Sequence, residues 1–269
     1  LELIVNQTCE QFGYQEIRNP IFEETGLFSR SVGEETDIVT KEMYSWEDVD
    51  GTSLTLRPEL TASVVRSYIQ HNLGTISPIQ RLYYSGPLFR RERPQKGRQR
   101  QFHQFGVEAF GSSNPEQDVE IIAIAWKILS LCGLANDSTL NLNSIGSKEC
   151  RNNYRTALKN YIYPYIKDFS KTSQHRFETN PLRILDTKSE KEQEILNDAP
   201  KISDYHNETD STHFESLKEF LKDIDLPFSI NHKLVRGLDY YTGTVFEFNS
   251  DSLGAVSYTH LTLPTSDLV

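Results

Sequence analysis

The residues best suited to chemistry in this sequence form a basic run at positions 90–100. The run, RRERPQKGRQR, holds six basic residues and one acid, a local charge of +5 in a chain whose net charge is −10. Most of the basic residues are arginines, whose planar guanidinium groups bind phosphate or carboxylate through paired hydrogen bonds. Gly97 would allow the backbone to come close to a ligand. The run indicates a turn that binds a polyphosphate, and a solvated surface turn is the alternative interpretation.

The segment that follows this turn carries an unusual set of side chains on one face. If it is a strand, Gln104, Gly106 and Glu108 lie between Phe102 and Phe110 on that face, and the other face is mostly apolar. A buried carboxylate must be paired or hydrogen-bonded, and a glycine leaves room above a sheet. We therefore expect a pocket for a small cationic or N–H-donating ligand. An ion pair between Glu108 and an arginine of the turn is the alternative.

A third candidate segment, residues 56–61 (LRPELT), leads into an expected helix. Glu59 and Thr61 stand at the start of that helix, where the helix dipole favours a carboxylate. They could bind a ligand at this end of the helix, or they could simply cap it.

A fourth candidate segment, residues 234–243 (LVRGLDYYTG), combines one cation with aromatic rings. Arg236, Tyr240 and Tyr241 could place a guanidinium and two amphipathic rings at one spot. A strand and turn with ordinary core tyrosines is the alternative.

The composition limits the class of protein. The chain has 269 residues, of which 37% are hydrophobic and 25% are charged, as in a soluble globular protein of one large or two modest domains. It contains no apolar run long enough to span a membrane. Three cysteines without a CxxC pair argue against a disulfide scaffold or a zinc site and favour a reducing compartment. The seven histidines show no metal-binding spacing, so we expect no protein-ligated metal.

Periodicity and turn signals predict an α+β fold with an antiparallel sheet rather than alternating βαβ units. The apolar pattern of residues 1–12 is already helical at Leu1, so we expect the chain to be a piece of a longer protein. The expected elements are helices at 1–12, 60–73 (ended by Gly74) and 115–131 (capped by Asn114 and Gln117), a hairpin at 45–55, strands at 80–90 and 100–110, helices within 147–225, and strand character at 231–248.

Several of these segments together resemble one family. Residues 89–93 (FRRER) have the motif 2 pattern of class II aminoacyl-tRNA synthetases, and residues 94–104 resemble the version found in bacterial-type histidyl-tRNA synthetases. The other matching segments are 18–23 (motif 1), 56–61 (the amino-acid-binding segment), 180–186 (within the insertion) and 234–241 (the histidine-specific motif). The resemblance runs from Leu1 to about Gly254.

The resemblance implies a catalytic domain with an antiparallel sheet of the class II type, flanked by helices and interrupted by a mainly helical insertion. It places the catalytic core with motifs 1 and 2 at 1–146, the insertion at 147–230, and the return to the core, with the histidine-specific motif, at 231–254. The family continues with motif 3, which carries an ATP-binding arginine, and an anticodon-binding domain. Residues 255–269 instead resemble translated adapter DNA, and we expect a non-native tail there.

The resemblance also implies the activity, which is the ATP-dependent conversion of histidine to histidyl-adenylate and its transfer to tRNA(His). Magnesium would come with ATP, the enzyme would be a cytoplasmic homodimer joined through the motif 1 region, and no membrane would be involved. Arg90 and Arg236 would be the catalytic residues. The residues implied for histidine binding are Glu59, Thr61, Arg90, Gln104, Glu108, Tyr240 and Tyr241, and those for ATP binding are Arg90, Glu92, Arg98 and Arg236.

Two other functions compete with this one. A histidine-sensing paralogue that regulates ATP phosphoribosyltransferase shares the fold but charges no tRNA, and the intact Arg236 and basic turn favour the synthetase over it. A nucleic-acid-binding module could use the basic turn as its contact surface. The acidic pI near 5.2 opposes nonspecific binding of that kind.

Overall fold

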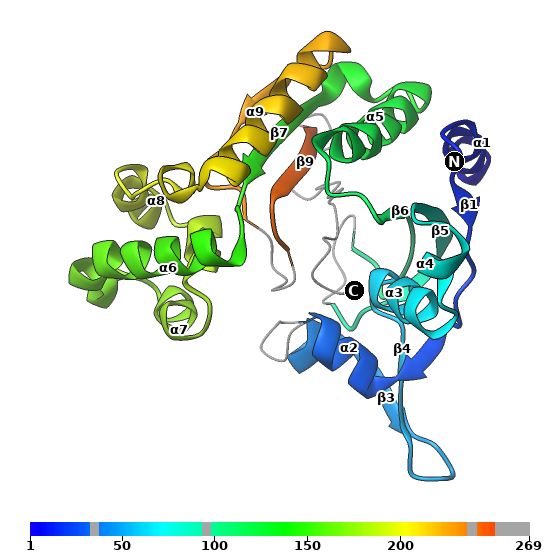
Figure 1. Cartoon of the computed structure of the whole chain (residues 1–269). Coiled ribbons are helices and arrows are strands. Elements are labelled where there is room, and N and C mark those ends of the chain that lie inside the picture. The colour runs from blue at the N-terminus through cyan, green and yellow to red at the C-terminus, as the bar shows by residue number, and fades with distance from the viewer. Residues whose placement is uncertain (33–37, 93–97, 236–240, 251–269) are drawn as a thin grey trace. The chain divides into compact units, whose positions relative to one another are not determined.

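The computed structural model describes residues 1–32, 38–92, 98–235 and 241–250 and divides the chain into two compact units (Figure 1). The first unit is built mainly from Leu1–Ser138, and the second from Thr139–Gly237 and Tyr241–Glu247. Strand β7 (Ser138–Ser144) thus groups almost entirely with the helical segment. The domain limits derived from the resemblance, which put that strand in the catalytic core, stay a prediction. Within the described ranges, no helix has the length and hydropathy needed to cross a membrane.

A long two-stranded ribbon organises the first unit. Strands β5 (Gln80–Phe89) and β6 (Gln101–Phe110) pair antiparallel along their whole length, and β1 (Gln15–Glu16) adds to β5 in parallel. Helices α1 (Glu2–Gln11) and α5 (Pro115–Leu131) cover one face of the ribbon. Its core consists of Val5, Cys9, Tyr14, Tyr83, Ile124 and Ile128, with Phe105, Val107 and Ala109 of β6 packed against them. The apolar face predicted for this strand is confirmed.

The other face of the ribbon packs against helix α3 (Thr61–Gln70). Leu60 and Val64 form a buried cluster with Leu82, Tyr84 and Leu88 of β5, and Phe102 and Phe110 of β6 pack against the cluster. The stretch of β6 between those phenylalanines is therefore directed toward the beginning of α3. This arrangement brings together two segments that the sequence marks as candidates, 56–61 and 104–108.

A second small sheet in the first unit has the order β2 (Phe22–Glu24), β4 (Ser53–Leu56), β3 (Tyr44–Glu47), with every pairing antiparallel. The hairpin predicted around Asp50-Gly51 joins β3 to β4 and is confirmed. Helix α2 (Thr25–Val32), the π-helical turn Ile38–Glu42, the short helix α4 (Leu73–Ile76) and the 3-10 turn Ala135–Asp137 complete this unit.

The second unit is mostly helical, as predicted for residues 147–225. Strand β7 lies between β8 (Phe228–Ile230), to which it is parallel, and β9 (Thr244–Ser250). The helices are α6 (Lys148–Ile162), α7 (Lys171–Thr179), α8 (Glu190–Asn197) and α9 (Glu208–Asp223), with 3-10 turns at Tyr163–Asp168, Pro181–Asp186 and Ile202–Tyr205. Buried Glu192 joins α7 to α8, because its carboxylate accepts hydrogen bonds from the Ser170 amide and the Ser173 and Thr187 hydroxyls.

Three local predictions are wrong. The helix expected to run to Gly74 ends at Gln70, because Asn72 takes a left-handed conformation (φ 49°), which asparagine tolerates better than most residues. Asn114 precedes α5 without a capping hydrogen bond from its side chain, and Gln117 instead donates to Tyr14 and Glu120. Residues 231–235 are not a strand, and the next strand among the described residues, β9, begins at Thr244.

Gly111, which ends β6, is expected to be far less tolerant of substitution than Gly13, although both have positive φ angles (93° and 79°). A Cβ at Gly111 would lie 1.8 Å from the Pro78 carbonyl oxygen, whereas a Cβ at Gly13 would meet nothing within 4 Å. We expect Gly111→Ala to lower the unfolding free energy by at least about 3 kcal/mol and Gly13→Ala by about 1 kcal/mol. Urea unfolding of the two variants measures this, and equal losses would contradict the backbone clash.

Candidate active site

The centre of the candidate site is the carboxylate of Glu108, which is 2% exposed. Two hydroxyl groups donate hydrogen bonds to its Oε1 atom: Thr61 Oγ1 at 2.8 Å, from the first turn of α3, and Tyr84 Oη at 3.0 Å, from β5. The two donor oxygens are themselves 3.4 Å apart. The sequence left open an ion pair between Glu108 and an arginine of the basic turn. Among the described residues, Glu108 forms no such ion pair.

This environment favours the protonated form of the acid. The pKa of Glu108 is raised to about 8, mainly by burial and in smaller part by the nearby charge of Glu59, against the lowering effect of the hydrogen bonds from Thr61 and Tyr84. Burial also raises the pKa of Tyr84 well above its ordinary value, so that its phenol stays a hydrogen-bond donor. The site thus holds a carboxyl group that a cationic or N–H-donating ligand would ionise.

The glycine at 106 serves a different purpose from the one expected. Gly106 stands opposite Tyr84 in the β5–β6 ladder, and a Cβ built on it would lie 2.3 Å from the phenol oxygen. The space above the glycine is therefore filled by the Tyr84 ring and not left for a ligand. An aromatic side chain that covers a glycine on the neighbouring strand is a known way to stabilise a sheet.

Glu59 lies just before α3 and is also buried, at 7% exposed. Its Oε1 atom accepts a hydrogen bond from the Ala62 amide at 3.0 Å, so the helix-capping alternative is observed. Burial raises its pKa, while hydrogen bonds from the first turn and the charge of Arg90 lower it. Two buried acids, Glu59 and Glu108, therefore lie close to the same helix start.

Arg57 fixes the segment that carries Glu59. Its buried guanidinium donates to three backbone carbonyl oxygens, from Nε to Pro87 at 2.9 Å and from Nη1 to Asn19 at 2.8 Å and Pro20 at 3.2 Å. A Cβ at Gly86 would lie 2.5 Å from Arg57 Nη2, so this second glycine of the ribbon makes room for the guanidinium. Arg57 therefore clamps three stretches of chain together.

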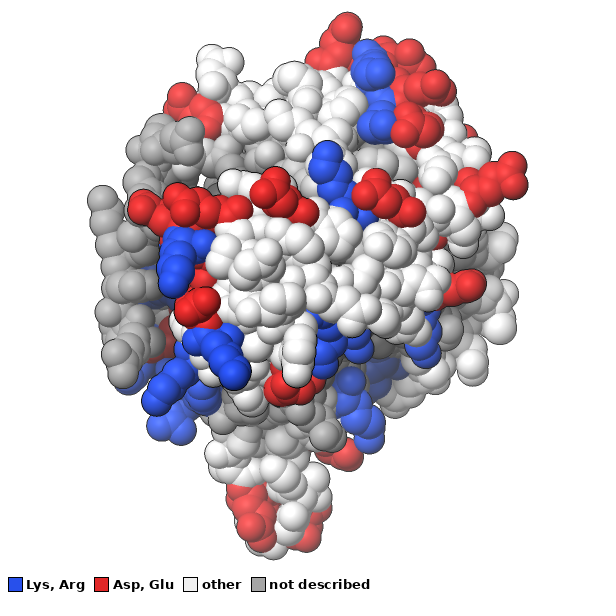
Figure 2. Space-filling view, turned by 90° about the vertical axis from the view of Figure 1, so that its left-hand side faces the viewer, with Lys and Arg blue, Asp and Glu red and all other residues white. Residues whose placement is uncertain are grey.

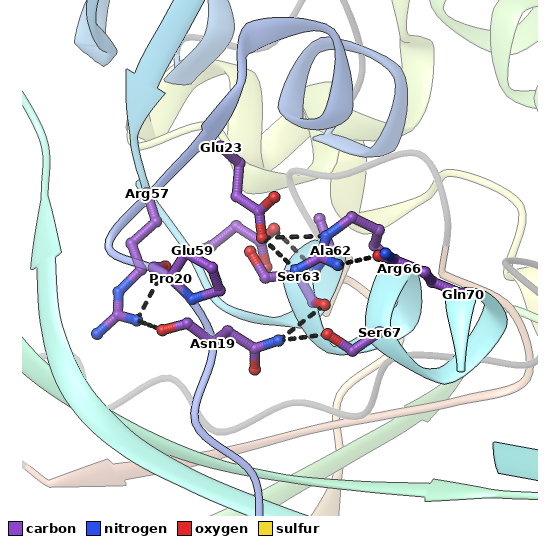
Figure 3. Close-up of polar contacts among 10 residues, drawn as sticks. All are labelled: Asn19, Pro20, Glu23, Arg57, Glu59, Ala62, Ser63, Arg66, Ser67 and Gln70. Atoms are coloured by element: carbon purple, nitrogen blue, oxygen red, sulfur yellow. Dashed lines mark hydrogen bonds and ion pairs between the residues drawn. The ribbon is translucent and has the colours of Figure 1, made fainter. Parts of the chain in front are cut away.

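Strand β2 and the segment before it are tied to α3 by a further network, which Figure 3 shows together with the contacts of Arg57 with Asn19 and Pro20. The Asn19 side-chain amide donates to the Ser63 carbonyl oxygen at 3.0 Å and to Ser67 Oγ at 2.7 Å. Arg66 of α3 forms an ion pair with Glu23 at 2.6 Å and donates to the Gln70 side chain. These contacts fix the position of α3, and hence of Thr61, relative to the rest of the first unit.

Arg90, the residue with which the basic run begins, is half-buried and near enough to Glu59 for its charge to lower the pKa of that acid. Its Nε donates to the Pro58 carbonyl oxygen at 2.9 Å, and its guanidinium carbon lies 5.2 Å from the centre of the Phe102 ring. Phe102 belongs to the face of β6 that includes Gln104 and Glu108. The structure thus brings the first arginine of the basic run to the face of β6 that also carries Glu108.

The other predicted residues are placed less completely. Gln104 is partly buried on this face, and Glu92 and Arg98 approach each other across the turn, with 3.6 Å between Glu92 Oε2 and Arg98 Nε. Tyr241 is buried in the second unit, where its carbonyl oxygen accepts a hydrogen bond from Arg151. Arg236 and Tyr240 lie outside the described residues, so their roles stay predictions.

Sequence reasoning missed two residues of the site, Tyr84 and Arg57 in its role as a clamp. Tyr84 could have been found from the sequence. If the two expected strands, 80–90 and 100–110, pair as a hairpin centred on residue 95, Tyr84 stands opposite Gly106, as observed. No comparable signal exists for Arg57, whose three acceptors come from separate segments.

Comparisons with known proteins show the family to which the chain belongs. A family model described as histidyl-tRNA synthetase matches residues 4–256. A histidine–tRNA ligase of Protochlamydia amoebophila (strain UWE25) is 52% identical over 95% of this chain and 60% of its own length, and one of Gloeothece citriformis (strain PCC 7424) is 54% identical over 95% and 59%. The crystal structure of apo S. aureus histidyl-tRNA synthetase superposes with a TM-score of 0.70 at 39% identity, over 92% of this chain and 56% of that one.

The chain has the fold of a class II aminoacyl-tRNA synthetase catalytic domain, with the β5–β6 ribbon at its centre. The family model covers nearly the whole sequence, and the chain belongs to the histidyl-tRNA synthetase family. It spans about 60% of the length of the curated relatives that it matches.

Glu108→Gln is expected to stabilise the chain at alkaline pH. The folded pKa of Glu108 is about 8 and its ordinary value is 4.5. Between these values the folded state keeps a proton that the unfolded state has released, so the contribution of Glu108 to stability falls as pH rises and levels off above pH 8. Relative to the wild type, we expect the glutamine variant to gain on the order of 3 kcal/mol between pH 5 and pH 8.

Urea unfolding of both proteins at the two pH values measures this difference, because other titrating groups affect the two proteins alike. The same pH dependence in both would show that Glu108 is not held in its protonated form.

Proposed function

We propose that this chain is the catalytic part of an enzyme that activates histidine with ATP and transfers it to tRNA(His). The observation that carries the proposal is the buried carboxyl group of Glu108, held on one oxygen by Thr61 and Tyr84 beside Arg90 and Glu59. A buried acid that is satisfied on one oxygen suits a ligand that brings an N–H group, as an imidazole does. Membership of the family supports the same assignment.

In this proposal, the residues assigned to the histidine side chain are Glu108, Tyr240 and Tyr241, as the family resemblance implies. Glu59, Thr61 and Gln104 hold the amino and carboxylate end of the amino acid. A site that depends on buried polar partners rejects amino acids that leave those partners unpaired, and this gives the discrimination that a synthetase needs.

Adenylation requires the histidine carboxylate to attack the α-phosphorus of ATP in line. Guanidinium groups can stabilise the negative charge that develops on the phosphoryl oxygens, and we assign this role to Arg90 and Arg236. The contacts of Arg90 with Pro58 and Phe102 hold its guanidinium in place before the substrates arrive. Glu92 and Arg98, which lie close together, serve the rest of the nucleotide.

The magnesium ion in this reaction enters with ATP, whose phosphates supply ligands to it. In the described part of the chain, no group of three or more His, Cys, Asp or Glu side chains is placed to hold a metal ion by itself.

Because the chain belongs to the histidyl-tRNA synthetase family, we also propose that the enzyme is cytoplasmic.

Transfer of histidine to tRNA requires a surface that accepts an acidic polymer. Figure 2 shows basic and acidic side chains interspersed over one face of the molecule, without a continuous basic area. Binding to arbitrary RNA through such a face would be weak, so we propose that the basic turn serves ATP and the acceptor end rather than a nonspecific nucleic-acid surface.

We also propose a homodimer that forms through the motif 1 region. Three large apolar side chains in or beside the β2–β4–β3 sheet are exposed: Ile21 at 46%, Phe22 at 50% and Trp46 at 40%. Phe22 and Trp46 contact each other edge to face, with ring centroids 5.9 Å apart. Exposed aromatic residues grouped in this way are typical of protein interfaces.

The activity is tested by histidine-dependent ATP–pyrophosphate exchange. The chain is compared with a version in which residues 255–269 are replaced by the corresponding C-terminal part of the Protochlamydia amoebophila relative. Arg90→Ala is expected to slow exchange by about 100-fold, as the loss of one preorganised donor does. Arg155→Ala, an exposed arginine of α6, is the control and should not change the rate.

An unchanged rate in Arg90→Ala would contradict the mechanism, and equal exchange with several amino acids would contradict the assignment to histidine. Histidine binding without exchange in either version would favour the histidine-sensing paralogue.

Phe22→Glu is expected to convert the dimer to a monomer, because it places a charge in the apolar surface proposed to be buried between two copies. Sedimentation velocity measures the change. Ile76→Glu is the control, because Ile76 is 75% exposed but lies outside that surface. A dimer that survives Phe22→Glu and dissociates with Ile76→Glu would place the interface elsewhere.

A further inference from the structure

Tyr84 combines features that strand packing alone does not require of a residue in β5. It is 5% exposed, its ring covers Gly106 on the neighbouring strand, and its hydroxyl reaches Glu108. Any side chain at Gly106 would displace the phenol, since a Cβ there would lie 2.3–2.7 Å from three of its atoms. The glycine and the tyrosine therefore act as one unit that delivers a hydroxyl group to the acid.

The two hydroxyl donors approach the same carboxylate oxygen. Thr61 reaches Oε1 from the helix and Tyr84 reaches it from the strand, at 2.8 and 3.0 Å. With Oε1 held from two sides, the plane of the carboxyl group is fixed. Both hydrogen bonds that described residues donate to Glu108 end on Oε1. A ligand would therefore meet the other carboxylate oxygen, Oε2.

We propose that Tyr84 is a positioning residue for amino-acid selection, whose phenol turns the Glu108 carboxyl group so that Oε2 meets the N–H group of the histidine ring. The inference rests on the proposed function for its ligand and adds a residue that acts through Glu108 without touching the substrate. Thr61 shares the task from the first turn of α3. Tyr84 lies in the paired ribbon and supplies the fixed reference.

The test compares histidine with 2-thiazolylalanine, an isostere whose ring has no N–H group, by calorimetric titration of the full chain. Tyr84→Phe keeps the ring over Gly106 and removes only the hydroxyl. We expect it to weaken histidine binding by about 10-fold, as the loss of a hydrogen bond to a charged group does, and to leave thiazolylalanine binding nearly unchanged. The preference for histidine therefore falls by about the same factor.

Tyr83→Phe is the matched control. Tyr83 is the neighbouring residue of β5, its side chain is in the cluster on the opposite face, and its hydroxyl donates to Glu10 at 3.5 Å. It should leave both affinities unchanged. A merely structural role of Tyr84 would weaken the binding of both ligands alike and lower the urea midpoint, and that result would overturn the inference.

The outcomes separate this inference from the proposed function. Exchange activity together with an unchanged preference in Tyr84→Phe would overturn the inference and leave the function in place. Histidine binding without exchange, with the preference lost in Tyr84→Phe, would overturn the catalytic function and support the inference. A wild-type chain with no preference for histidine over thiazolylalanine would overturn both.

Discussion

The buried carboxyl group of Glu108 is the constraint on which the first unit depends. Removal of an acid from water is costly unless hydrogen bonds replace the lost solvation, and the proximity of Glu59 adds to the cost. Thr61 must therefore lie at the first turn of α3, Tyr84 must be opposite a glycine, and α3 must pack at one height along the ribbon. The buried acid therefore lowers the stability of the fold wherever it is ionised.

The surrounding frame holds the start of α3 in place. Arg57 joins the segment that carries Glu59 to the backbone at Asn19, Pro20 and Pro87, and the Asn19 side chain joins the same region to α3. Most of these bonds end on backbone carbonyl groups, so they depend on the path of the chain more than on neighbouring side chains. Two acids can therefore be held near each other without drifting apart.

Much of this architecture could be predicted from the sequence, because it depends on local patterns. The alternation in β6 identified its apolar face and the face of Glu108, and the Asp-Gly turn identified the β3–β4 hairpin. Features that depend on two segments at once could not be read from either segment alone. The ring of Tyr84 over Gly106 requires the register of the ribbon, and the Arg57 clamp requires the path of the chain before β2. The end of α3 was missed because asparagine at 72, rather than the glycine at 74, takes the left-handed conformation.

The acceptors of the Arg57 guanidinium lie 30, 37 and 38 residues away along the chain. Each such contact closes a long loop, and the entropy lost in closing the loop offsets part of the free energy that the contact contributes. Local elements such as α1 and the β3–β4 hairpin can form early, whereas this three-way junction requires the chain from Asn19 to Pro87 to be in position. We therefore expect the junction at Arg57 to close after these local elements have formed.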